Sequence, residues 1–306
     1  MNDKLYVILP YFNFVGYKSN ERNLNIFLKN FKSYSNAELI IVEGFIDENA
    51  QLDDFGDRVF KHIKVKLHDI LWVKENLINI GFSSLGEWQY GAWIDRDIQF
   101  ANPDWALESI EKLKNCDILQ PFTECVYLDN KFQFSEENNG YFLKKKSEYS
   151  RITSFCNWFC NDEIQKAGNI LGHAGHVWAI NKNFYDKIGG LPDKCIIGGG
   201  DGVLPQAIRQ NYNHFHYRHL GQVYKDYCEK AKDARVAYTN GLILHHFHGG
   251  INERSYAKRF EIFYKRQFNI EADLKYKNNV LCFSESGKKF AKEIEEYFIS
   301  RNEDNL

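Results

Sequence analysis

Apolar runs alternate with amphipathic stretches along the first part of the chain. Three runs of β-favouring apolar residues predict strands over 4–12, 38–43 and 59–66. Between the first two runs, apolar residues in 20–34 recur at the spacing of one helix face, and 73–85 predicts a second helix. The chain therefore opens with alternating strands and helices.

The same alternation continues further along the chain. An apolar run at 89–100 predicts a strand that runs straight into charged residues. Further strands are predicted over 116–128 (a pair), 173–180 and 241–248, and helices over 104–115, 182–188, 202–211, 253–268 and 285–300. The polar and aromatic stretch 129–170 predicts a loop-rich insertion or lid.

Strands joined to helices by short loops predict an α/β fold, with a mostly parallel sheet flanked by helices. We expect one α/β domain over 1–250, with halves at about 1–100 and 101–250, and a helical C-terminal extension over 251–306. Ligands of such sheets bind beyond the carboxyl ends of the strands. The polar residues at predicted strand ends are Asn13, Glu43, Asp95 and Asp97.

The composition excludes several classes of protein. The 306 residues are 44% hydrophobic and 26% charged, which suits a packed globular chain. The net charge of −2 argues against a chain-wide electrostatic grip on nucleic acid. No apolar run approaches the ~18 residues of a membrane span, and the opening residues lack the pattern of a signal peptide.

The cysteine pattern indicates a reducing compartment. Seven cysteines are scattered along the chain, and an odd number in a chain of this size favours free thiols and a cytoplasmic location. Cys156 and Cys160 have helical spacing, but no second Cys or His pair follows at the spacing of a zinc site. We therefore expect no structural zinc.

The sharpest chemical feature is Asp95-Arg96-Asp97, at the end of the strand predicted over 89–100. In an extended strand, two carboxylates at i and i+2 point the same way. Two like charges held together need a cation beside them, and a divalent metal that also binds a diphosphate supplies it. Alternatively, the pair marks a solvated strand end with Arg96 as its partner.

Several blocks in this order resemble the GT-A fold glycosyltransferases, broadly of family 2, with a galactosyltransferase-type second half. The resemblance covers about residues 5–260. It is carried by Val7–Asn13, Glu43, Trp72–Asn79, Asp95–Asp97, Gly175–Ile180 with Phe184, Ile188–Gly190, Gly199–Asp201 and His246–Gly249. Each block alone is a weak signal, and their order along the chain makes the resemblance specific.

The resemblance implies a metal-dependent transferase that moves a sugar from a UDP-sugar to an acceptor hydroxyl. The expected cofactor is Mn²⁺ or Mg²⁺. The residues expected at the nucleotide-sugar donor are Pro10, Tyr11, Asn13, Glu43, Lys74, Asn79, Asp95 and Arg254. Arg259 is an alternative contact for the diphosphate, and both arginines are equally compatible with a solvated helix face.

Asp201 is the expected catalytic base. An inverting transfer needs a group that takes the proton of the attacking hydroxyl, and Gly198–Gly200 lets the backbone approach a sugar closely. Many family members carry Glu-Asp here, whereas this chain has Gly200-Asp201, which leaves Asp201 as the only carboxylate of the block. Alternatively, Asp201 caps the helix predicted over 202–211.

The late histidines are expected to complete a metal site. Strand alternation places His246 and His248 on one face of GLILHHFHG and His245 on the other. Imidazole suits manganese as a ligand, so the expected metal ligands are Asp95, Asp97, His248 and His246, with His248 preferred because it lies nearest the loop. Hydrogen-bonded strand-end histidines are the alternative.

The acceptor side is defined less sharply. Gly199 and Gly200 are expected to face the acceptor, with Trp178 or Trp158 as a stacking platform for a sugar, although a buried core Trp is an equal alternative. Lys145 lies in a run of cations and aromatic residues over 141–155. That mixture fits nucleic acid, an acidic glycan or a solvated loop.

The sequence leaves three readings of the function open. The transferase acts either on a glycan or on a hydroxymethylated pyrimidine in DNA, as in bacteriophages that glycosylate their own genome. A non-catalytic nucleotide- or glycan-binding module is a second class, disfavoured by the intact carboxylates. A metal-dependent nucleotidyltransferase is a third, which gives no reason for the Gly-Gly-Asp and histidine blocks. The sugar and the oligomeric state stay open.

Overall fold

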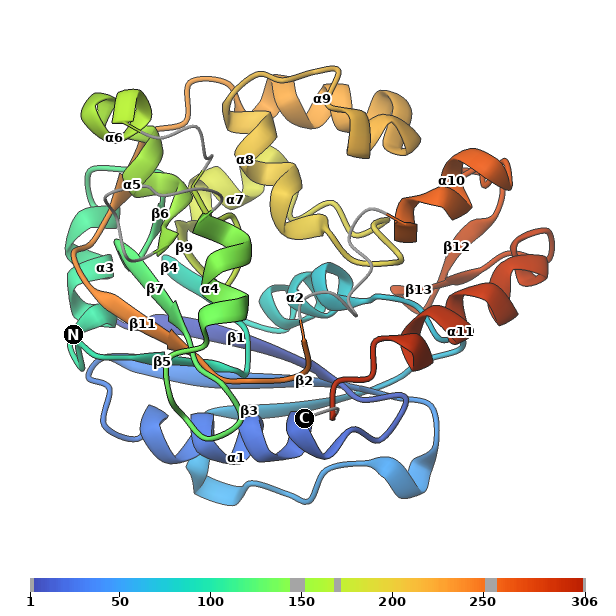
Figure 1. Ribbon diagram of the computed structural model, residues 1–306, viewed down its shortest axis with the longest axis horizontal. Helices are drawn as coiled ribbons and strands as arrows, with labels where there is room; N and C mark the ends of the chain where they lie inside the picture. The colour runs from blue at the N-terminus through green and yellow to red at the C-terminus, as the bar shows by residue number, and fades with distance from the viewer. Residues whose placement is uncertain (1–2, 144–151, 168–171, 251–257, 305–306) are drawn as a thin grey trace.

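The computed structural model describes residues 3–143, 152–167, 172–250 and 258–304. Seven strands form a central sheet (Figure 1). In spatial order they are β10 (Val236–Tyr238), β6 (Ile118–Gln120), β9 (Val177–Asn181), β4 (Tyr90–Ile94), β1 (Leu5–Phe12), β2 (Ala37–Phe45) and β3 (Lys61–Lys66).

Most neighbouring strands of this sheet run parallel. β1 is parallel to β2 and β4, β2 to β3, and β10 to β6, whereas β9 is antiparallel to both β4 and β6. The predicted α/β class with a mostly parallel sheet is therefore confirmed. Because β1, β2 and β4 run the same way, they all end at one edge of the sheet, at Phe12, Phe45 and Ile94.

Helices cover both faces of the sheet. Helices α1 (Lys18–Phe31) and α3 (Trp105–Leu113) pack on one face. The other face is covered by α2 (Lys74–Ser83), α7 (Lys182–Ile188), α8 (Val203–Ile208) and α9 (Gly221–Ala231). Alternate residues of β1 enter the two cores: Val7 belongs to the same apolar cluster as Phe27 of α1, and Ile8 to the same cluster as Leu77 of α2.

The single strand predicted over 89–100 is two strands in two different sheets. After β4, residues 95–97 turn, and β5 (Ile98–Phe100) joins a smaller sheet with β11 (Leu242–His245), β7 (Glu124–Tyr127) and β8 (Ile152–Thr153). β5 is antiparallel to β11, which is parallel to β7. The turn ends the strand alternation between Asp95 and Asp97 and places both residues beyond the edge of the main sheet.

The remaining segments contain short elements. Within 129–170 the structure describes α4 (Glu136–Leu143), α5 (Phe155–Phe159) and α6 (Asp162–Ala167). The C-terminal part holds α10 (Glu261–Lys265), α11 (Ala291–Ser300) and a hairpin of β12 (Leu274–Lys277) with β13 (Val280–Phe283), so it is not purely helical. Phe263, Phe283 and Phe298 of this part belong to the same apolar cluster as Leu77. The domain boundary at residue 250 stays a prediction.

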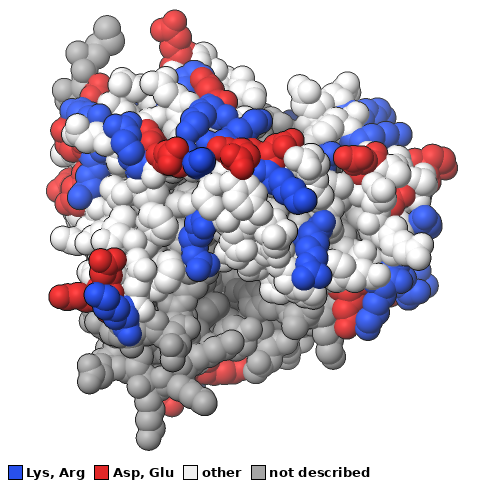
Figure 2. All heavy atoms as spheres, turned by 90° about the horizontal axis from the view of Figure 1, so that it is seen from above, with Lys and Arg blue, Asp and Glu red and all other residues white. Residues whose placement is uncertain are grey.

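The surface carries both signs of charge. On the face seen in Figure 2, the described Lys and Arg side chains are interspersed with Asp and Glu, in line with the net charge of −2. In the described part of the chain, no helix is both long enough and apolar enough to span a bilayer. All seven cysteines are free thiols, as the odd count predicts.

Candidate functional site

A cavity of about 150 Å³ opens beyond the carboxyl ends of β1 and β4. Its lining joins residues that are far apart in the sequence, from the turn after β1 to the segment after α11. The polar side chains of its lining include Asn13, Lys74, Asp95, Asp97, Asp201, His245, His248, Arg259, Arg301 and Glu303. This is the sheet edge at which the sequence places a ligand site.

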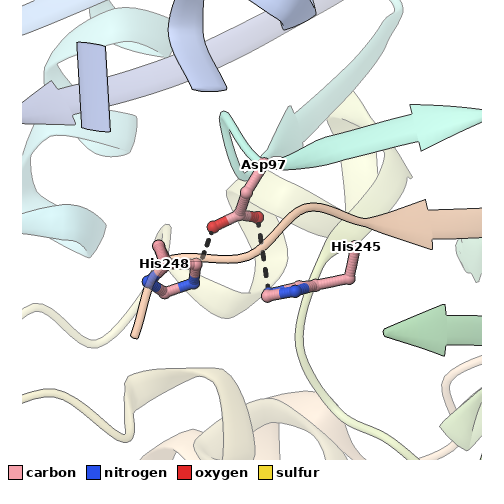
Figure 3. A group of neighbouring side chains, drawn as sticks. All are labelled: Asp97, His245 and His248. Atoms are coloured by element: carbon pink, nitrogen blue, oxygen red, sulfur yellow. Dashed lines mark ion pairs between the residues drawn. The ribbon is translucent and has the colours of Figure 1, made fainter. Parts of the chain in front are cut away.

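Asp97 lies between two imidazoles in this cavity (Figure 3). It is held in the turn between β4 and β5 and is 4% exposed. Its Oδ2 lies 2.9 Å from Nε2 of His248, and its Oδ1 lies 3.7 Å from Nε2 of His245. One ligand atom from each of the three residues lies within 4.8 Å of the other two, a spacing that suits one cation.

The Asp97, His245 and His248 side chains fit a divalent metal. Carboxylate oxygen and imidazole nitrogen are the ligand types that manganese accepts. Among the described residues, none donates a hydrogen bond to Oδ1 of Asp97, although this atom is buried, and buried acceptors are normally satisfied. Burial opposes ionisation, but His245 and His248 hold the pKa of the Asp97 carboxyl well below its usual range. The side chain is therefore an anion at neutral pH, as a metal ligand must be.

The histidine pair differs from the one that strand alternation predicts. β11 ends at His245, so the alternation of faces does not extend to residue 248, and the backbone beyond the strand brings His248 to Asp97. His245 contacts Asp97 from the strand itself. Nε2 of His246 instead lies 3.2 Å from Oε1 of Gln99. The structure thus groups His245, and not His246, with Asp97 and His248.

Asp95 faces a different partner from Asp97. Nζ of the buried Lys74 lies 2.6 Å from Oδ1 of Asp95 and 2.6 Å from Oδ1 of Asp201. Burial lowers the pKa of Lys74, but the two carboxylates outweigh it and raise the pKa above its usual value. Lys74 therefore ties the carboxylate that follows β4 to the one that precedes α8. The i, i+2 pair does not point to one metal, because the strand breaks between its members.

Asp201 lies in the cavity wall and does not cap a helix. It is the middle residue of a short 3₁₀ turn, Gly200–Gly202. The N-cap residue of α8 is Gly202, and no side chain caps that helix. The capping alternative for Asp201 therefore fails, and its one described hydrogen-bond donor is Lys74.

Glu75 stands next to this pair, and the sequence motifs did not single it out. The side chain is 4% exposed, and its Oε2 has no hydrogen-bond partner among the described residues. A Cβ at position 200 would collide with the carboxylate end of Glu75, so a larger residue there requires the Glu75 side chain to move. Burial, followed by the Asp201 carboxylate, raises the pKa of Glu75 to about 8. This chain has no carboxylate at position 200, but Glu75 of α2 places its own carboxylate in the space beside Gly200.

We expect the protonation of Glu75 to appear in the pH dependence of stability. A carboxyl whose pKa is raised on folding binds a proton in the folded chain that the unfolded chain releases between about pH 4.5 and 8, so stability falls as pH rises through this window. Glu75→Gln removes that loss. Relative to the wild type, the Tm of Glu75→Gln should rise by about 3 °C or more from pH 5 to pH 8.5. Parallel Tm profiles of the two proteins over this range would contradict the assignment.

The predicted donor residues divide between the first cavity and a neighbouring one. Pro10 lines the first cavity, while Asn13 lines both. The second cavity, of about 370 Å³, lies beyond β1 and β2 and includes Tyr11 and Glu43 in its lining. The carboxylate of Glu43 accepts a hydrogen bond from the Leu52 amide at 2.6 Å and lies 2.8 Å from His62 Nε2, so it fixes the loop after β2.

Asn79 is not brought to either cavity. Its side chain bonds to both the amide and the carbonyl of Leu191 and to the Tyr185 hydroxyl, which anchors the Gly190–Leu191 turn. Arg254 lies outside the described residues. Arg259 does line the first cavity, where a Cβ on Gly199 would lie 2.9 Å from its Nη2.

The acceptor residues are placed unevenly. Gly199 lines the cavity with φ of +89°, a conformation that favours glycine. Trp178 is 2% exposed and stacks on Trp93 inside the core, so it offers no open face to a sugar. Trp158 is covered by the guanidinium of Arg209. Lys145 lies outside the described residues.

Two histidines from the Gly175–Ile180 block and just before it also line the cavity. His173 and His176 stack at 4.1 Å, with the Tyr127 hydroxyl 3.1 Å and 3.3 Å from their Nε2 atoms. Burial, with His173 beside it, lowers the pKa of His176 far below its usual value. His176 has φ of +82°, and its carbonyl accepts the Asp95 amide at 2.9 Å. This strained residue therefore fixes the turn that carries Asp95.

No protein-family model matches the chain, and no curated protein matches it. In structure the chain is similar to solved glycosyltransferases. Drosophila β1,4-galactosyltransferase 7 in complex with manganese, UDP-Gal and xylobiose is 10% identical over 78% of this chain and 65% of that one, with a TM-score of 0.39. TarS from S. aureus is 10% identical, with 80% and 37% of the chains covered and a TM-score of 0.46.

A third similar structure is a mannosyltransferase from Pyrobaculum calidifontis in complex with GDP-Man and Mn²⁺. It is 11% identical over 97% of this chain and 70% of that one, with a TM-score of 0.46. This chain thus spans less than two thirds of the first two structures. The likeness to all three is distant.

Proposed function

We propose that the chain is a metal-dependent glycosyltransferase that moves a sugar from a UDP-sugar to an acceptor hydroxyl with inversion. The observation that carries this proposal is the meeting of two chemically different groups in one cavity. Asp97, His245 and His248 form a set of metal-ligand type, and Asp201 is a separate carboxylate held by Lys74. The motif resemblance names the same reaction for Asp97 and Asp201.

The donor is assigned to the side of the cavity at β1 and β2. In the proposal, a nucleoside occupies the second cavity and its phosphates extend past Asn13, which lines both cavities, toward Asp97, His245 and His248. These three residues would hold the metal. When bound, a divalent cation supplies positive charge that stabilises the leaving diphosphate. Arg259, at the Gly199 wall, is placed to meet the same charge.

The acceptor is assigned to the Gly199–Asp201 side. Oδ1 of Asp201 is occupied by Lys74, and its Oδ2 lies toward Gly175 in the cavity wall. In the proposed reaction, Oδ2 takes the proton of the acceptor hydroxyl as the oxygen attacks the anomeric carbon. Lys74 keeps the carboxylate in one orientation, which leaves a single oxygen for the proton.

The acceptor class stays a prediction between a glycan and a hydroxymethylated pyrimidine in DNA. The DNA interpretation rests on Lys145, which lies outside the described residues, and the net charge of −2 weighs against it. A glycan acceptor is therefore the version proposed. A location in the cytoplasm is proposed from the free thiols alone.

A panel of UDP-sugars tests the proposal. With Mn²⁺, one donor should be hydrolysed slowly without acceptor, releasing UDP at a measurable rate, and EDTA in excess should stop the release. GDP-sugars serve as the matched control for the choice of nucleotide, because they carry guanine in place of uracil. A protein that binds UDP-sugars by calorimetry but releases no UDP, with or without glycan acceptors, is a binding module, and the enzyme assignment then fails.

A further inference from the structure

The segment after α11 passes through the metal side of the cavity. Arg301 and Glu303 line the cavity. Glu303 is 4% exposed, and a buried carboxylate is costly unless it is paired. Its Oε1 accepts a hydrogen bond from Nε of Arg301 at 2.7 Å, and its Oε2 lies 3.5 Å from Arg96 and 3.7 Å from His248. The carboxylate is thus directed at the turn and the histidine of the metal site.

Contacts from the turn after β1 fix the position of this segment. The Tyr17 hydroxyl shares its one hydrogen between the carbonyls of Phe298 and Ile299, at 3.0 Å and 2.9 Å, and accepts from the Asn302 amide at 3.0 Å. The Asp304 carboxylate accepts the first amides of α1, those of Lys18 and Ser19, at 2.8 Å and 2.7 Å. Glu303 is therefore held between two anchored neighbours.

Gly249 makes room for this passage. It follows His248 directly and has φ of +92°. A Cβ there would lie 2.9 Å from Cα of Glu303, closer than two carbons approach in packed proteins. The glycine after His248 thus allows the backbone at Glu303 to run against the histidine loop. The close approach of the two backbones thus depends on a glycine at position 249.

His248 consequently stands between two carboxylates. Its Nε2 lies 2.9 Å from Oδ2 of Asp97, while its Nδ1 lies 3.7 Å from Oε2 of Glu303. Histidines that bind a metal through one ring nitrogen commonly direct the other to a carboxylate, which fixes the orientation of the ring. Glu303 occupies that second position here.

We infer that Glu303 is a positioning residue of the metal centre: its carboxylate orients the His248 ring so that Nε2 faces the cation beside Asp97. The inference rests on the proposed metal-dependent function. The inference also assigns a role to Arg301 and Arg96, which hold the Glu303 carboxylate beside the His248 ring. Losing such an outer carboxylate typically costs about 10- to 100-fold in metal affinity.

Mn²⁺ binding tests this directly. The loss of the free-Mn²⁺ signal in electron paramagnetic resonance gives the Kd, measured with and without UDP, on wild type, Glu303→Gln and His248→Ala. Glu303→Gln should raise the Kd for Mn²⁺ by about 10- to 100-fold. Glu303→Asp keeps the charge but retracts it by one methylene, so its Kd for Mn²⁺ should fall between those of the wild type and Glu303→Gln. This variant also tests the inference if Glu303→Gln folds poorly.

Asp117→Asn provides the matched control for a lost carboxylate. Asp117 is paired with Arg235 at 2.6 Å, and neither residue lines the cavity. Its substitution should lower the Tm without changing the Kd for Mn²⁺. A Kd for Glu303→Gln within twofold of wild type, while His248→Ala binds weakly, overturns the positioning role alone. Unchanged Mn²⁺ binding by His248→Ala, or no binding by wild type, overturns the metal centre itself.

Discussion

Replacing Asp97 with asparagine is expected to reduce sugar transfer by about 10³-fold or more. Asp97 is the only carboxylate of the described three-residue metal group, and asparagine keeps its size while removing the charge. A bound divalent ion contributes several kcal/mol to stabilisation of the leaving diphosphate, and each 1.36 kcal/mol corresponds to about a factor of ten in rate. The measurements are UDP release and transfer rate across a Mn²⁺ titration, together with the Kd for UDP.

Two alanine variants sharpen this test. The structure groups His245 with Asp97 and places His246 against Gln99. His245→Ala should therefore raise the Mn²⁺ concentration needed for half-maximal rate more than His246→Ala does. The reverse order would restore the ligand pair expected from strand alternation. Undiminished transfer by Asp97→Asn in excess EDTA would remove the metal from the reaction altogether.

The sheet was predictable because its signals are local. The apolar runs at 4–12 and 38–43 became β1 and β2, since runs of consecutive β-favouring residues of this kind leave few other solutions. The split of 89–100 into β4 and β5 was not predictable, because the run is apolar on both sides of the charged turn. Which sheet a strand joins depends on partners distant in the sequence.

That one split changed the interpretation of the site. A continuous strand would direct Asp95 and Asp97 to one cation, whereas the turn directs Asp95 to Lys74 and Asp97 to the histidines. Both residues of the motif line the same cavity. The motif could not assign their partners, because those come from α2, from the last residue of β11 and from the loop after β11.

Glu75 and Glu303 show a second limit. Both are buried carboxylates beside residues that the sequence did single out, Asp201 and His248. The available signals were indirect: glycine at position 200 where the resembling family has glutamate, and glycine at position 249. A missing side chain indicates that something else fills the space, but only the folded chain shows what fills it.

The Asp201→Asn variant is expected to lower the transfer rate by about 10²- to 10⁴-fold, the usual contribution of a general base. Asparagine preserves the size of the side chain, and its carbonyl oxygen still accepts a hydrogen bond from Lys74, which also keeps its ion pair with Asp95. It cannot take up the acceptor proton. Single-turnover transfer, the Kd for UDP-sugar and the Tm should be measured on one preparation.

The pattern across these three quantities separates the roles that Asp201 could have. A base affects the acceptor proton only, so donor binding and donor hydrolysis by water should change far less than transfer. Lys74→Met is the contrasting variant, because it leaves Asp95 and Asp201 without their shared cation; breaking a buried ion pair costs about 3–5 kcal/mol, less here because both carboxylates are partly exposed. It should lower the Tm as well as the rate, whereas Asp201→Asn should lower the rate alone. Near-normal transfer by Asp201→Asn would contradict the role of Asp201 as a base. The contacts of Lys74 with Asp95 and Asp201 would then be purely structural.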